Sequence, residues 1–145
     1  MIKKSSAVLA VCLSFCILFS LTVLAESEWD PNFMVSLLQS AMQDTWDDYD
    51  MDLSAYGDNC IRMKIGMKGI GTKDFTVSNR SQVIEAWNNA KSSWADMSKA
   101  AYDVFTTLGF DDKLFTVCVM DDISDESSDV WFVAVNGNIV YDLFC

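Results

Sequence analysis

The sequence contains no histidine, only one proline, and ten basic residues against 21 acidic ones. Without histidine, the chain lacks the usual general base at neutral pH, the nucleophilic triads that depend on it, and most zinc sites. The net charge of −11 opposes binding to nucleic acid and to anionic lipid. These absences exclude large classes of enzymes and of nucleic-acid-binding proteins, and no cofactor is predicted.

The first 25 residues have the composition of a secretory signal peptide. An apolar run over residues 7–24 follows two lysines and ends in a small-residue cleavage pattern at Ala25. The run is almost long enough to span a bilayer, so an uncleaved N-terminal anchor is the alternative. A lipid anchor at Cys12 or Cys16 fits less well, because neither cysteine follows a small residue. We predict a secreted or extracytoplasmic protein, membrane-anchored only if the signal is retained.

Residues 26–145 are predicted to form one domain, because this length suffices for a single core but not comfortably for two. Loss of the two signal-peptide lysines leaves 8 basic residues against 21 acidic ones, a net charge of −13. Such acidity is typical of a soluble exported domain.

Three cysteines remain after the signal peptide, and an odd number in an oxidising compartment predicts one disulfide bond and one leftover thiol. The last residue of a chain is usually disordered unless a bond holds it, and a disulfide bond at Cys145 would do so. We predict a bond between Cys60 and Cys145, with Cys118 to Cys145 as the alternative, because Cys118 resembles a packed strand residue.

The first helix is expected over residues 30–49, with Asp30 as its N-cap and Pro31 at the first helical position. Residues 47–59 are rich in aspartate and mimic the start of a calcium-binding loop. Leu53, however, stands where such a loop needs glycine. We therefore interpret this segment as a solvated exit from the helix.

Residues 61–67 alternate between apolar residues and basic residues or glycine, which is the period of a strand with one buried face. Residues 74–77 are a candidate for a short second strand. Over residues 83–108 apolar residues recur every three or four positions, which predicts one long amphipathic helix that Gly109 ends. The two tryptophans on this stripe are predicted to lie in the core.

Three further strands are expected over residues 114–120, 130–135 and 139–144. Asn136-Gly137 between the last two is a strong hairpin signal. A two-residue turn there assigns alternate residues to a core face and to an open face. The predicted core residues are Phe132, Ala134, Ile139, Tyr141 and Leu143, and the predicted open-face residues are Trp131, Val133 and Asp142.

The predicted fold is a small two-layer α+β domain, with two helices packed on one face of a mostly antiparallel sheet that ends in a three-stranded meander. A helix followed by such a meander resembles the ending of cystatin-like and PepSY-like exported domains, whose members often inhibit or bind other proteins. The sequence has no cystatin-type Gln-x-Val-x-Gly loop, and the resemblance covers only about the last third of the chain.

Two charged segments are candidate binding sites. The candidate calcium ligands are Asp121, Asp122, Asp125, Glu126 and Asp129, although their spacing fits no named calcium loop and a solvated loop is the preferred interpretation. The candidate docking strip consists of Arg62, Lys64, Lys68 and Trp131, which would offer cationic and apolar contacts to a partner. The alternative for this strip is a solvated sheet face that lies opposite acidic neighbours.

The sequence favours a non-catalytic binding or interaction role at or outside the cell surface, because no catalytic residues can be named. A carboxylate-dependent hydrolase is one alternative, but it needs two acids at fixed separation in a cleft, and these acids cluster in loops. An exported protease-inhibitor-like module is the other. The expected partner is another exported protein or an anionic polymer of the cell envelope, and neither nucleic acid nor, after signal cleavage, a membrane.

Overall fold

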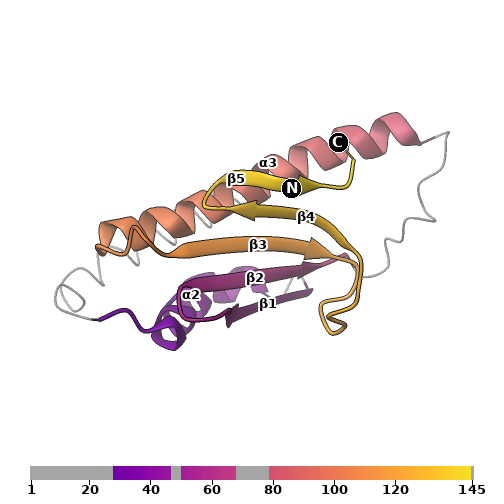
Figure 1. The fold of residues 1–145 in the computed structure, drawn as a ribbon. Helices are drawn as coiled ribbons and strands as arrows, with labels where there is room; N and C mark the ends of the chain where they lie inside the picture. Colours follow the sequence, from indigo (N-terminus) through magenta and orange to yellow (C-terminus); the bar gives the residue numbers. More distant parts are fainter. Residues whose placement is uncertain (1–27, 47–49, 68–78, 145) are drawn as a thin grey trace.

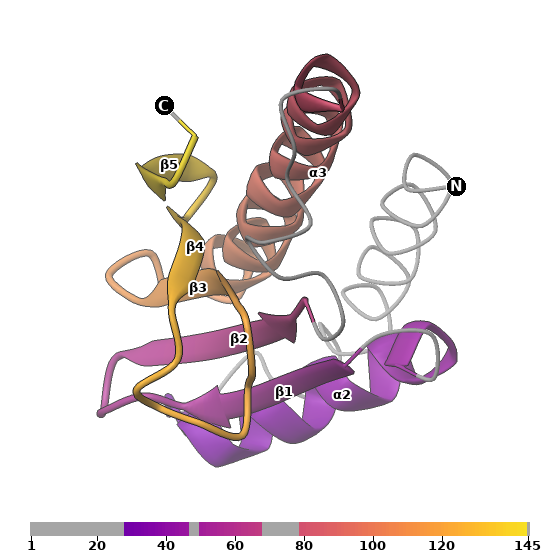
Figure 2. The same ribbon diagram turned by 90° about the vertical axis from the view of Figure 1, so that its right-hand side faces the viewer.

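The computed structural model describes residues 28–46, 50–67 and 79–144, and in these ranges the chain forms an α+β fold of two helices and five strands. The elements in chain order are α2 (Pro31–Trp46), β1 (Asp50–Ala55), β2 (Cys60–Gly66), α3 (Arg80–Thr107), β3 (Leu114–Met120), β4 (Val130–Val135) and β5 (Asn138–Asp142). Both helices lie on one side of the sheet, α2 behind β1 and β2 and α3 behind β3 to β5 (Figures 1 and 2). Neither helix is long and apolar enough to cross a membrane, and this statement concerns the described ranges alone.

The sheet is mixed, with one parallel pair among mostly antiparallel neighbours. Its strand order is β1-β2-β3-β4-β5, in which β2 and β3 run parallel and the other neighbours run antiparallel. The parallel pair arises because α3 lies between these two strands in the chain, which makes a crossover connection. The predicted meander of β3, β4 and β5 is confirmed, and most neighbouring strands are antiparallel as predicted, but the sequence analysis did not foresee the parallel pair β2–β3.

β1 occupies a segment that the sequence analysis assigned to a solvated helix exit. Its apolar residues Met51 and Leu53 are buried, whereas Asp50 and Asp52 are exposed. This alternation is the period of a strand with one buried face, and the neighbouring aspartates hide it in the sequence. α2 correspondingly ends at Trp46, before the predicted end at residue 49.

The core lies between the helices and the sheet. α3 turns its predicted apolar stripe inward, and Gly109 follows its end with a φ of 86°. Trp87 is buried in the core as predicted, whereas Trp94 is partly buried and packs against the core, its ring 5.3 Å from that of Trp87. The largest fully buried side chains are Trp131, Phe105, Phe115, Phe132, Met34, Leu38, Met42, Ile61, Met63, Val117 and Val119.

Trp131 lies in this core rather than on the open face of the sheet. Val130 pairs with Met120 and Phe132 pairs with Val119, so Trp131 is an extra residue in β4 at a β-bulge. The bulge turns Trp131 toward the helices, where its ring lies 6.2 Å from that of Trp87. The prediction for Trp131 is therefore wrong, because the sequence pattern assumed a regular ladder.

A second irregularity, between Val133 and Ala134, shifts the register of β5 against β4. Phe132 and Ala134 are buried as predicted, but the β5 residues that were assigned to the same core face are not. The exposed fractions are 46% for Ile139, 44% for Tyr141 and 40% for Leu143. The irregularity pairs Tyr141 with Val133, which puts Tyr141 on the open face, whereas Ile139 still pairs with the buried Ala134.

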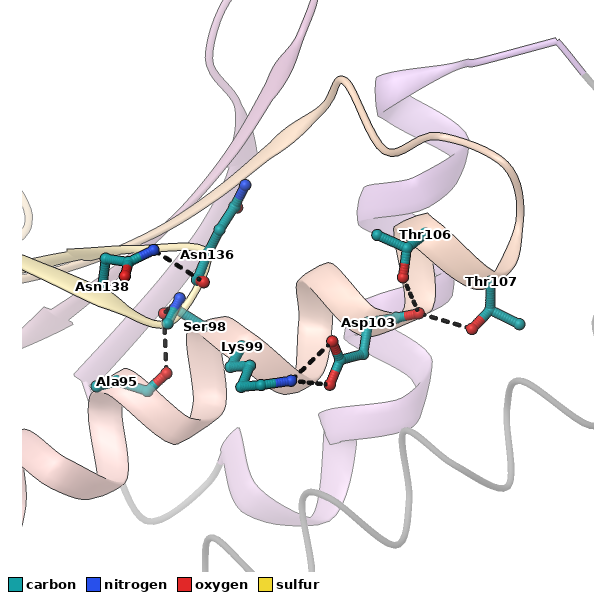
Figure 3. Close-up of polar contacts among 9 residues, drawn as sticks. Ala95, Ser98, Lys99, Asp103, Thr106, Thr107, Asn136 and Asn138 are labelled. Atoms are coloured by element: carbon teal, nitrogen blue, oxygen red, sulfur yellow. Dashed lines mark hydrogen bonds and ion pairs between the residues drawn. The ribbon is translucent and has the colours of Figure 1, made fainter.

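The β4–β5 turn docks on the middle of α3. Asn136 and Gly137 have φ values of 50° and 88°, as the predicted two-residue turn requires. The Gly137 N–H donates to Oγ of the buried Ser98 at 2.8 Å, and this hydroxyl donates to the Ala95 carbonyl at 2.9 Å (Figure 3). A Cβ atom on Gly137 would lie 2.8 Å from Cβ of Lys99, so the close approach of the turn to the helix requires glycine.

Asp142 fixes the other end of β5. Its Oδ1 accepts from Nε1 of Trp87 at 2.8 Å and its Oδ2 accepts from Nζ of Lys91 at 2.8 Å. The Asp142 side chain is only 4% exposed, although the sequence pattern assigned it to the open face. One face of α3 carries Trp87, Lys91 and Ser98, because these residues are spaced by four and seven positions. This face therefore binds both ends of β5.

Candidate functional site

Arg62 and Lys64 of the predicted docking strip lie on the open face of the sheet, the face turned away from the helices. Lys64 is at its centre, in register with Asp52 of β1 on one side and Cys118 of β3 on the other. Lys64 is only 6% exposed, which is unusual for a lysine. A buried ammonium needs a nearby anion, because its desolvation is otherwise uncompensated.

Glu126 supplies that anion from the loop between β3 and β4. Its Oε1 accepts from Nζ of Lys64 and, at 3.4 Å, from Nη2 of Arg62. The Glu126 side chain is 71% exposed, so the loop reaches over the strip from the solvent side. The hydrogen bond from Lys64 holds the pKa of the Glu126 carboxyl below its usual value, and the Arg62 charge adds to this effect.

Arg62 is the second basic residue of this ion cluster. Its guanidinium lies over the ring of Tyr56, 4.4 Å from the centroid. Within the described part of the chain, Nε of Arg62 is buried and has no hydrogen-bond partner. The basic residues of β2 thus lie opposite an acidic neighbour, which is the arrangement that the sequence analysis gave as the alternative to a docking strip.

The structure brings together only part of the predicted strip. Arg62 and Lys64 are neighbours on β2, whereas Trp131 is buried in the core on the other side of the sheet and Lys68 lies outside the described residues. A continuous surface of cationic and aromatic side chains on the open face is therefore not formed by the described members.

The other acids of the β3–β4 loop are engaged within the loop. Oδ1 of Asp122 accepts from the N–H and the hydroxyl of Ser124, and Oδ1 of Asp125 accepts from the corresponding groups of Ser127. The bonds from Ser127 lower the pKa of the Asp125 carboxyl. Backbone pairing of Asp121 with Asp129, at 3.0 Å, closes the loop. In the ranges that the structure covers, no three His, Cys, Asp or Glu side chains are grouped so that they could hold a metal ion, and calcium binding stays a prediction.

Cys60 and Cys118 lie on the open face and form no disulfide bond with another described residue, and Cys145 lies outside the described residues. The predicted disulfide bond between Cys60 and Cys145, and its alternative from Cys118, therefore stay predictions. Burial raises the pKa of the Cys118 thiol, although the charges of Arg62 and Lys64 oppose this shift. A raised pKa keeps the thiol protonated and slow to react.

Exposed apolar residues occur along β5 and in the two positions after it, which the sequence analysis missed. Ile139, Val140 and Tyr141 are consecutive, and Val140 is 60% exposed. Leu143 and Phe144 continue the same segment and are also exposed. We call these five residues the β5 patch. Monomeric proteins seldom leave so many adjacent large apolar side chains in water.

β5 is also an edge strand, at the end of the sheet order. Edges are usually guarded by charges, proline or irregular pairing, because free backbone groups invite another strand. β1, the other edge, carries the exposed Asp50 and Asp52. β5 carries one charge, Asp142, and that carboxylate is turned toward α3. The pairing of β5 with β4 is irregular at Val140, so β5 has a β-bulge but no exposed charge, whereas β1 has exposed charges.

One sequence signal could have identified this surface. The segment Ile139-Val140-Tyr141 is apolar at three consecutive positions, so it cannot place apolar residues on one face of the strand and polar residues on the other.

Comparisons of the chain with protein families, with curated proteins and with solved structures found no match.

Proposed function

We propose that this protein is a small exported domain with a non-catalytic binding role at or outside the cell surface, and that it binds an extended segment of another exported protein along β5. The β5 patch is the observation that carries this proposal. A segment with the composition of a core strand is exposed at a sheet edge, and both ends of the strand are fixed to α3. Binding there would add a strand to a preformed template.

The fixed position of β5 supports binding without large rearrangement. The strand starts at a turn bonded to Ser98 and ends at a carboxylate bonded to Trp87 and Lys91. A rigid edge loses little conformational entropy when a partner binds, so backbone hydrogen bonds and apolar burial contribute more fully to affinity. The expected partner segment is extended and apolar at alternate positions.

The acidic side chains give no comparable support to a hydrolase. Among those that the structure describes, Asp122 and Asp142 are the half-buried ones. Asp122 accepts from Ser124, and Asp142 accepts from Trp87 and Lys91. Both carboxylates thus have structural partners, whereas carboxylate catalysis needs a pair that faces a substrate.

An anionic cell-envelope polymer is the less supported partner. It would need the basic residues of β2, and Glu126 already lies against Arg62 and Lys64. A polymer would have to displace this glutamate and approach the other acids of the same loop. The β5 patch presents no such competition.

Selection of displayed random peptides would test the proposal. Peptides are selected on the parent protein and counted against a Val140→Lys variant, with Phe33→Lys as a control that adds the same charge at an exposed apolar residue of α2. We expect enriched peptides with few charges that bind the parent and the control but not Val140→Lys. If no enriched peptide distinguishes Val140→Lys from the parent, β5 is not the binding edge.

A further inference from the structure

The outer side of β5 offers backbone groups for another strand. In the portion of the chain that the structure describes, β5 pairs with β4 and with no other strand. The side chains around this edge are those of the β5 patch. An added strand would therefore gain both hydrogen bonds and apolar contacts.

The charge of the chain restricts what can approach this edge. The chain carries a net charge of −11, so most of its surface repels another acidic protein. β5 is an exception, because Asp142 is neutralised by Lys91 at 2.8 Å and only 4% of its side chain is exposed. Two acidic molecules can thus meet at β5 without opposing carboxylates from this strand.

We propose that β5 pairs antiparallel with β5 of a second copy of this chain, so that one sheet continues through a symmetric dimer. This inference rests on the part of the proposed function that makes β5 a binding edge, and it names a second copy of the chain as a partner of that edge. A two-fold axis across the edge places identical segments against each other. The apolar residues of one β5 patch then face those of the other, and each copy keeps its Asp142 turned toward its own α3.

The contrast between the two edges supports a closed dimer over a growing fibre. If β5 of one copy could add to β1 of the next, each addition would leave a new free edge. Asp50 and Asp52 are exposed on β1, and a strand added there would have to cover them. Pairing of β5 with β5 uses the edge of each copy that has no exposed charge, and it leaves free only the β1 edges with their exposed aspartates.

The size of the β5 patch sets the expected affinity. Stable complexes bury about 800 Å² per partner, and weak encounters bury less. A patch of five partly exposed apolar residues, three in β5 and two directly after it, lies at the low end of this range, and the like net charges of two copies oppose their approach. We expect a dissociation constant in the micromolar range or above.

Sedimentation velocity of the protein purified after export tests the proposal across the micromolar to millimolar concentration range. The parent is expected to shift from monomer to dimer. Added salt should strengthen the dimer, because it screens the repulsion between acidic copies and does not weaken apolar contacts. Val140→Lys should raise the dissociation constant at least tenfold, whereas Phe33→Lys should leave it unchanged.

Two results would overturn the dimer. One is a parent protein that stays monomeric at every concentration, and the other is a Val140→Lys variant that dimerises as the parent does. The first result leaves the proposed function standing if selected peptides still bind the parent and not Val140→Lys. A dimer that Val140→Lys abolishes, combined with no peptide binding, would support self-association and contradict binding to other proteins.

Discussion

Ser98 of α3 accepts a hydrogen bond from the backbone N–H of Gly137 at 2.8 Å, and this contact fixes the β4–β5 turn on the helix. Ser98 is fully buried, so the N–H would have no solvent to replace the hydroxyl. Ser98→Ala should therefore lower the free energy of unfolding by about 1–3 kcal/mol, the cost of an unsatisfied buried donor. Chemical denaturation measures this loss.

Ser92→Ala is the matched control for that change. Ser92 lies on the same helix, is exposed, and uses its hydroxyl only for a bond to the Asn88 carbonyl one turn earlier. Its replacement should change stability by no more than about 0.5 kcal/mol. Equal effects of the two substitutions would contradict the role of Ser98 in holding the turn.

Asp142→Ala should be strongly destabilising, because it removes the acceptor for Trp87 and Lys91 at the end of β5. We expect a loss of about 2–3 kcal/mol, since hydrogen bonds to charged groups are the stronger class. Asp103→Ala is the control, because Asp103 binds Lys99 at 2.7 Å with both side chains exposed (Figure 3). An exposed pair of this kind contributes roughly 0.3–0.5 kcal/mol. Thermal unfolding compares the two variants, and a similar loss in both would show that burial does not strengthen the Asp142 contacts.

The bond between Glu126 and Lys64 should make stability depend on pH. The pKa of Glu126 is lower in the folded chain than its ordinary value of 4.5, because the folded state favours the ionised carboxylate. The resulting stabilisation is fully present above pH 4.5 and is lost as the pH falls through the lowered folded-state pKa. The difference in stability between the parent and Glu126→Gln should therefore shrink on acidification. Asp129→Asn, which removes a charge from the same loop at an exposed position, serves as the control for loss of charge alone.

Release of Glu126 should also expose Cys118. The thiol lies beside Lys64 in register on the open face, and burial raises its pKa. Glu126→Ala should increase the rate at which a thiol reagent modifies Cys118 severalfold at neutral pH, because the loop loses its bond to β2. Mass mapping of modified peptides separates Cys118 from the other cysteines. An unchanged rate at Cys118 would show that the loop stays in place without Glu126.

Regular features of the fold were predictable from the sequence. The long helix followed from a stripe that α3 turns inward along its length, and the β4–β5 turn followed from two residues that tolerate positive φ. Both signals are local, because they depend on spacing or on backbone preference. They did not require knowledge of what lies across the sheet.

The errors occurred where local regularity is broken. The bulge places Trp131 in the core, where its ring packs near that of Trp87. A pattern of alternating apolar and polar residues cannot predict such a contact between distant residues. The burial of Lys64 depends on a glutamate that is 62 residues away in the chain. Long-range pairing of charges and shifts of register are tertiary effects, so the candidate site was only partly predictable.

The parallel pairing of β2 with β3 has a consequence for the order in which the chain folds. β1 with β2, and β3 with β4 and β5, join neighbours in sequence, so each group can form early by local hairpin closure. The β2–β3 pair instead joins Cys60 with Leu114 and requires all of α3 to lie between them. Closing so long a loop costs entropy before the contacts form, and high contact order slows folding. We therefore expect two partly folded ribbons to precede the complete sheet, each exposing the apolar edge that the other will cover.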